Sequence, residues 1–156
     1  MSDFYLFISS KDSLQFHKDN CYHDFIVELG REYDVTPSQL FRSRSNWSVA
    51  LVEIKLESDV GEPSPQIKDD LLVVCNVVSP SFIKGTERRI LRPLPVGKSG
   101  QLLSLAQAYY MSLSTTCFSR LHITLLDKDL NKLKAEEGWP EEAEHTLSCT
   151  LHFQKM

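Results

Sequence analysis

The chain has 156 residues, a length typical of one domain, and 42% of them are hydrophobic, which is enough to form a core. Its net charge of −4 argues against a general basic surface for nucleic acid, because such surfaces bind by neutralising phosphates. No apolar run approaches the ~20 residues that span a bilayer, and residues 1–13 lack the pattern of a signal peptide. We therefore expect one soluble domain over residues 1–156, made in the cytosol, not secreted and not bound to membranes.

Short patterned segments predict β-strands along the whole chain. The last of them alternates Leu147, Cys149, Leu151 and Phe153 with polar side chains, which indicates a strand with one buried face. Residues 70–79 are nearly all apolar, as is typical of a central strand. The predicted strands cover residues 4–8, 24–30, 47–56, 70–79, 88–96, 101–111, 120–127 and 147–153.

The connections between these segments indicate the fold class. Several of them are a dozen residues or longer, which favours a Greek-key sandwich over an up-and-down barrel with uniformly short turns. We predict an all-β protein, an antiparallel two-sheet β-sandwich formed as a single jelly roll of about eight strands. A short helix over residues 102–111 is the alternative for that segment. The predicted core contains Trp47, Val49, Leu51, Leu72, Val74, Ile123, Leu125, Leu151 and Phe153.

Sequence motifs for catalysis or metal binding do not occur. The chain has no nucleophile elbow, no His-Glu-x-x-His helix and no glycine-rich phosphate loop, so we expect no enzyme activity, no catalytic residue and no cofactor. His17, Cys21 and His23 come closest to a metal site, but a structural zinc site needs a second pair of ligands, and we expect no metal. The four cysteines are far apart, and at least two of them fall at strand positions with a buried pattern, so reduced core thiols are expected in preference to disulfides.

Three polar features carry weaker hypotheses. His122 and His152 lie on the less apolar faces of their strands and could meet carboxylates such as Asp127 or Glu53. Their simpler interpretation is that they are surface or sheet-face residues. The acidic residues within 136–144 form a solvated loop or, alternatively, a docking patch for a basic partner.

The segment 88–96 is the main candidate for a contact between subunits. It places arginines beside aliphatic residues, a composition common at protein interfaces, and its prolines limit strand pairing to an edge or a strand end. Guanidinium groups in this segment could bind the carboxylates of residues 136–144 in a neighbouring copy. A solvated strand face is the alternative. The candidate interface residues are Arg88, Arg89, Leu91, Arg92 and Leu94.

Eight segments of the chain, taken in order, carry a resemblance to a known family: residues 3–6 with Ser9 and Ser10, 24–29, 47–54, 73–80, 83–86, 91–96, 121–127 and 151–153. Their order resembles that of a family of small structural proteins carried by Polinton or Maverick elements and by related adintoviruses and adomaviruses. The stretch 130–140 departs from the short, glycine-containing hairpin of that family.

This resemblance implies a virion component, a penton-type or minor-capsid-type subunit that acts through self-assembly. Its partners would be copies of itself, with a pentamer favoured over a trimer, and other capsid proteins, and no specific nucleic acid is expected. The alternative is a non-catalytic β-sandwich that binds a protein or glycan, or a virion cement or receptor-binding protein. The oligomeric state in solution distinguishes a capsid subunit from a monomeric binding module.

Overall fold

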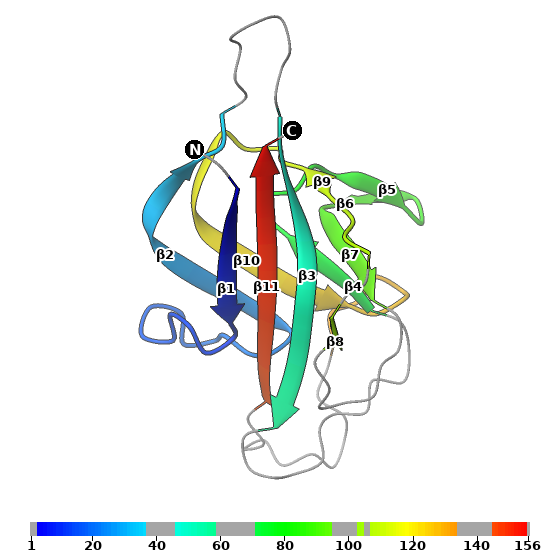
Figure 1. Ribbon diagram of the computed structural model, residues 1–156. Coiled ribbons are helices and arrows are strands. Elements are labelled where there is room, and N and C mark those ends of the chain that lie inside the picture. The colour runs from blue at the N-terminus through cyan, green and yellow to red at the C-terminus, as the bar shows by residue number, and fades with distance from the viewer. Residues whose placement is uncertain are drawn as a thin grey trace, which may run out of the picture.

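The computed structural model describes residues 3–36, 46–58, 71–94, 103–104, 107–133 and 145–155. In these ranges the chain forms strands, turns and irregular segments (Figure 1), and no helix long and apolar enough to cross a membrane occurs among them. The strands are β1 Phe4–Ser9, β2 Asp24–Asp34, β3 Trp47–Ser58, β4 Leu71–Cys75, β5 Ser81–Ile83, β6 Thr86–Arg88, β7 Ile90–Leu94, β8 Leu103–Ser104, β9 Met111–Ser112, β10 Cys117–Leu126 and β11 His145–Lys155.

Two antiparallel sheets form the body of the protein. Sheet A has the order β1-β11-β3-β8, with β9 also paired to β3, and sheet B has the order β2-β10-β4-β7. The chain crosses from one sheet to the other after β1, β2, β3, β7, β9 and β10, so most neighbours in a sheet are distant in sequence. This is the strand order of a jelly roll, two interleaved Greek keys, and it confirms the predicted fold class.

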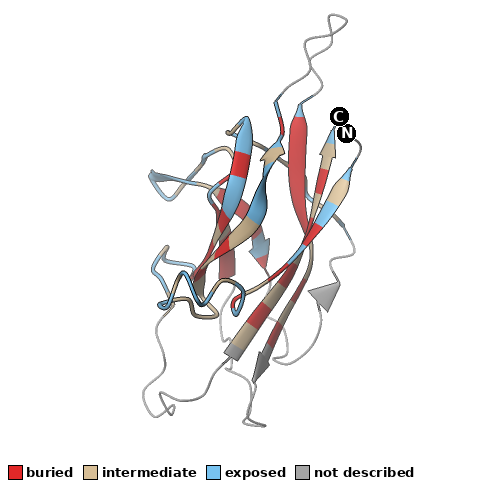
Figure 2. Cartoon of the chain, turned by 90° about the vertical axis from the view of Figure 1, so that its left-hand side faces the viewer, coloured by how far each residue is buried: buried red, intermediate tan, exposed pale blue. Residues whose placement is uncertain are grey.

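The core fills the space between the two sheets. Figure 2 shows buried residues alternating with more exposed ones along several strands. The alternation seen in the sequence sets these positions, because residues two apart in a strand share a face. Seven of the nine predicted core residues lie in the main core. The prediction was wrong in phase for Leu72 and Val74: Leu71, Val73 and Cys75 of β4 face the main core, and Leu72 and Val74 join a smaller cluster on the other side of the strand. Phe153 is fully buried, and its ring lies 4.8 Å from that of Phe4 on β1 and 5.2 Å from that of Phe118 on sheet B.

The terminal strand predicted from residues 147–153 is confirmed and lies inside sheet A. β11 pairs with β1 from Phe153 opposite Phe4 to Ser148 opposite Ser9, and with β3 along its whole length. Its inward side chains Leu147, Cys149 and Leu151 are all buried.

Two predicted strands are divided in the structure. The segment 88–96 begins in a short hairpin of β5 and β6, continues into β7, and is described as far as Leu94. The hairpin turns at Lys84 and Gly85, whose φ values of 46° and 79° are those of a two-residue hairpin turn. The segment 101–111 contains β8 and the start of β9, and residues 107–110 between them are not helical, so the helix alternative is not borne out there.

Candidate assembly and binding surfaces

The five predicted interface residues are divided between the surface and the interior. Leu91, Arg92 and Leu94 of β7 are buried, with exposed fractions of 1%, 8% and 5%. Arg89 is half-buried, and only Arg88 is exposed. The side chains of Leu91, Arg92 and Leu94 therefore pack within one subunit, and Arg88 is the member of the set that a second molecule can reach.

The two inner arginines bind the segment that leads into and follows β9. Arg92 Nη1 donates to Gln107 O at 2.5 Å, and its guanidinium carbon lies 4.4 Å from the centre of the Tyr109 ring. Arg89 Nη1 donates to Ser114 Oγ at 2.6 Å and to Val78 O at 2.9 Å. These planar, multiply donating side chains hold residues 107–114 against the edge of sheet B.

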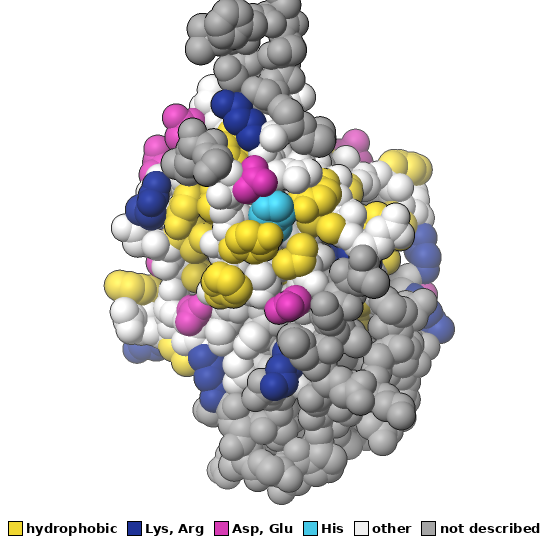
Figure 3. All heavy atoms as spheres, in the orientation of Figure 1, with side chains coloured by type: hydrophobic (Ala, Val, Ile, Leu, Met, Phe, Trp, Pro, Cys, Tyr) yellow, Lys and Arg dark blue, Asp and Glu magenta, His cyan; other side chains and the backbone are white. Residues whose placement is uncertain are grey.

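An aromatic strip, defined as Tyr5, Phe7, His152 and Tyr110, lies on the outer face of sheet A. Tyr5 and Phe7 are 55% and 76% exposed, and Figure 3 shows hydrophobic side chains gathered around a histidine on this face. The Tyr5 ring stacks on the His152 ring at 4.4 Å, and Tyr110 Oη lies 2.7 Å from His152 Nδ1. Burial raises the pKa of Tyr110, so its hydroxyl stays protonated.

The strip interrupts the usual polar surface of a sandwich. Asp3 Oδ2 lies 3.4 Å from His152 Nε2 at one end of it. Tyr5 and Phe7 alternate along β1 with the buried Leu6 and Ile8, so this strand is apolar on both faces although one face meets solvent. Exposed contiguous aromatic surface of this kind marks interaction sites in soluble proteins.

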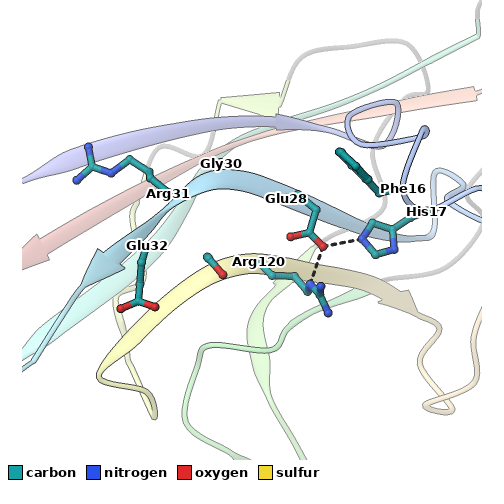
Figure 4. Close-up of a pocket in the computed structure, with 8 residues that line it drawn as sticks. Phe16, His17, Glu28, Gly30, Arg31, Glu32 and Arg120 are labelled. Atoms are coloured by element: carbon teal, nitrogen blue, oxygen red, sulfur yellow. Dashed lines mark hydrogen bonds and ion pairs between the residues drawn. The ribbon is translucent and has the colours of Figure 1, made fainter.

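A groove on the outer face of sheet B is the second surface feature. It encloses about 710 Å³ and is lined by Phe16, His17, Glu28, Gly30, Arg31, Glu32, Ser119 and Arg120 (Figure 4). The groove lies at a bulge where the regular pairing of β2 and β10 is interrupted. Four residues of β2, 29–32, lie opposite one residue of β10, Ser119. Gly30 permits this bulge, since its φ of 74° lies in the left-handed region.

Glu28 organises the charges of the groove. His17 Nε2 and Arg120 Nε both donate to Glu28 Oε1, at 2.8 and 2.7 Å, as the dashed lines in Figure 4 show. The hydrogen bond from His17 and the charge of Arg120 hold the pKa of Glu28 below its ordinary value, so the carboxylate is ionised at neutral pH. The Phe16 ring, 67% exposed, adds an apolar wall.

A third cluster surrounds Asp24 at the start of β2. Asp24 Oδ1 accepts from His122 Nε2 at 2.6 Å and from Thr124 Oγ1 at 3.3 Å, and Oδ2 accepts from Lys132 Nζ at 3.0 Å. Burial alone would raise the pKa of Asp24, but the hydrogen bonds from His122 and Lys132 outweigh it and keep the pKa below its ordinary value.

The histidines named in the sequence analysis have partners other than those expected. His122 binds Asp24 and His152 lies beside Asp3, in place of Asp127 or Glu53. His17 binds Glu28, whereas Cys21 Sγ lies 3.5 Å from His23 Nε2. Within the ranges that the structure describes, no three such side chains come together as metal ligands.

All four cysteines are free. Cys75 and Cys149 are buried, as expected for core thiols, whereas Cys21 is half-buried and Cys117 is exposed. Burial raises the pKa of Cys75 to about 11 and that of Cys149 to about 12, so neither thiol ionises at neutral pH.

Strand order and surfaces together define the chain as a jelly-roll β-sandwich with an aromatic outer strip. No family model matches the sequence, and no curated protein matches it. Among solved structures, it is similar to the crystal structure of the selenomethionine-labelled mavirus penton protein, with 14% identity and a TM-score of 0.37 over 69% of this chain. The chain spans about a third, 35%, of that protein's length, and this likeness is too distant to assign a function.

Proposed function

We propose that this protein is a structural subunit of a viral capsid, of the penton or minor-capsid type, that acts through assembly and without catalysis. The observation that carries the proposal is a jelly-roll fold whose sheet A presents Tyr5 and Phe7 uncovered to solvent. Jelly rolls build capsids and lectins, and an uncovered aromatic strip fits a protein whose working state has neighbours. The order of segments shared with Polinton-type structural proteins supports the same assignment.

The expected working form is a closed ring of identical subunits, five favoured over three, located in the virion with other capsid proteins. Arg88 remains a candidate contact because it is exposed, and within the part of the chain that the structure describes its guanidinium donates to the adjacent Glu87 carbonyl. Its proposed partner, the acidic stretch 136–144 of a neighbouring copy, lies outside the described residues.

Analytical ultracentrifugation of the purified chain, together with imaging of particles that contain it, tests this proposal. We expect a concentration-dependent rise in mass and density for this chain in the particle shell. Substituting Arg88→Glu should weaken the ring contact without changing the melting temperature, with Lys18→Glu, at an exposed lysine before β2, as the control for charge reversal. A chain that stays monomeric alone and never joins a particle with other virion proteins would refute the capsid assignment.

A β-sandwich binding module is the second candidate, favoured by the groove between Phe16 and Arg120. Its ion pairs and apolar wall suit a protein or glycan ligand with both polar and apolar groups. This function would be supported over the capsid function by two results together. The chain would stay monomeric at all concentrations, and the Arg120→Ala variant would lose binding to a protein or glycan ligand that the wild type binds.

A further inference from the structure

The outer edge of β1 lacks the features that normally protect a sheet edge. Residues 4–9 contain no charge and no proline, and β1 pairs with β11 without a bulge. Among the residues that the structure describes, no strand pairs with the other side of β1. Soluble proteins usually protect such an edge with lysine, proline or a bulge, because open backbone groups attract another strand.

The hydrogen bonds at the end of β1 show which backbone groups face outward. Ser10 N donates to Leu147 O toward β11, whereas Ser9 N donates to Asp12 Oδ2 and Ser9 O accepts from Asp12 N. Because the groups of successive residues in a strand point to opposite sides, Tyr5 and Phe7 share the outward direction of Ser9. The turn at Asp12 already satisfies Ser9, so among the described residues the N–H and C=O groups of Tyr5 and Phe7 are the ones left without a strand partner on this side.

These two residues are symmetric about Leu6. We propose that the β1 edge binds β1 of a second copy of this chain, antiparallel about a two-fold axis at Leu6, with each Tyr5 opposite Phe7 of the other copy. This register pairs the open groups of both copies in about four hydrogen bonds. It also keeps Tyr5 and Phe7 on the outer face and Leu6 on the core face, since facing residues in an antiparallel pair point to the same side.

The side chains favour a second copy as the occupant. An edge without charges meets no like charge when it pairs with itself, and the register places aromatic rings of the two copies side by side. The exposed parts of Tyr5 and Phe7 amount to about 500 Å² across two copies, well below the roughly 1,200 Å² of a stable interface. The dimer formed through β1 alone is therefore weak, and its population depends on protein concentration.

A two-fold contact is complete with two copies and cannot close a ring of five, so it is distinct from the ring contact proposed above. Two copies joined at β1 would form one sheet that runs continuously through both sandwiches. In a larger assembly this contact would join two rings rather than neighbours within a ring.

Charge substitutions on β1 test both the contact and its register, with mass measured by sedimentation across a range of concentrations. We expect Phe7→Glu to weaken pairing about tenfold or more, because two carboxylates then lie diagonally across the axis. Tyr5→Lys should weaken it similarly. The double variant Tyr5→Lys, Phe7→Glu should pair again to within about threefold of the wild type, since each lysine then faces a glutamate.

Two controls keep the test decisive. Phe82→Glu replaces an aromatic residue that is 77% exposed on the β5–β6 hairpin, and it should leave the mass unchanged. Because Tyr5 also stacks on His152, a mixture of Phe7→Glu and Phe7→Lys chains repeats the test without altering Tyr5; each alone should fail to pair and the mixture should pair.

The contact is refuted if the wild type never doubles its mass, if both single variants pair like the wild type, or if neither the double variant nor the mixture recovers. Rings that form normally in Phe7→Glu, with no loss of mass, would remove the β1 contact and leave the proposed capsid function in place.

Discussion

Replacing Phe153 by alanine should remove the side chain that joins the two sheets at one end of the sandwich. Phe153 is fully buried on β11, stacks on Phe4 of β1 with an interplanar angle of 6°, and meets Phe118 of β10 at 24°. Deleting a buried phenylalanine costs about 3–5 kcal/mol, and the two ring contacts place this site near the upper end of that range. For a chain of this length the melting temperature should fall by roughly 10–20 °C.

Urea unfolding followed by tryptophan fluorescence measures this loss, because Trp47 is buried with its ring 5.6 Å from that of Phe4. Phe82→Ala is the matched control, since that ring is 77% exposed, and its effect should stay within about 0.5 kcal/mol. A loss below about 1.5 kcal/mol for Phe153→Ala, with the unfolding slope unchanged, would show that the ring does not bridge the sheets.

Further changes have separate expected outcomes. Arg92→Ala should lower the free energy of unfolding by about 1–3 kcal/mol in urea titrations, because it removes the bond to Gln107 O and the contact with Tyr109; an unchanged midpoint would contradict the role of Arg92. Asp24→Asn should destabilise the protein at pH 7, and the difference from wild type should shrink as pH falls below about 4. The depressed pKa of Asp24 means that its stabilisation is complete above the unfolded value and is lost through the lower folded value, so a difference that persists at pH 2 in acid titrations would be evidence against it. Chelation should leave the melting curve unchanged, and elemental analysis that finds about one zinc per chain would contradict this. Deleting residues 147–156 should abolish cooperative melting, because β1 and β3 then lose their common neighbour.

The alternation of apolar residues was sufficient to predict the long strands and most of the core, but not the short β5–β6 hairpin. In β3 and β11, period-two patterns place Leu51 and Leu151 inward, and both are fully buried. The same rule cannot predict which strands become neighbours. Residues 4–8 are apolar on both faces, yet β1 is an edge strand whose Tyr5 and Phe7 meet solvent. The sequence did contain a signal for the aromatic strip, because residues 4–8 are apolar on both faces. It could be used only with the knowledge that β1 lies at a sheet edge.

The positions of charged side chains were harder to predict because their partners are distant in sequence. Arg92 lies in a segment that suits a surface, but Gln107 O, 15 residues away, makes burial of its guanidinium possible. His122 finds Asp24 across 98 residues, a contact that exists only once β2 and β10 are adjacent. The groove around Glu28 likewise depends on a bulge whose register no local pattern encodes.

The place of β11 between β1 and β3 has a consequence for synthesis. β11 pairs with β1 in sheet A but is synthesised long after it, because the partners Phe4 and Phe153 lie 149 residues apart. At about 5–20 residues per second, a ribosome needs roughly 7–30 s to deliver that neighbour. During that interval both sides of an apolar strand are open to other nascent chains. Slower initiation, lower temperature or a bound chaperone should therefore raise the yield of folded protein more than any change to the finished core.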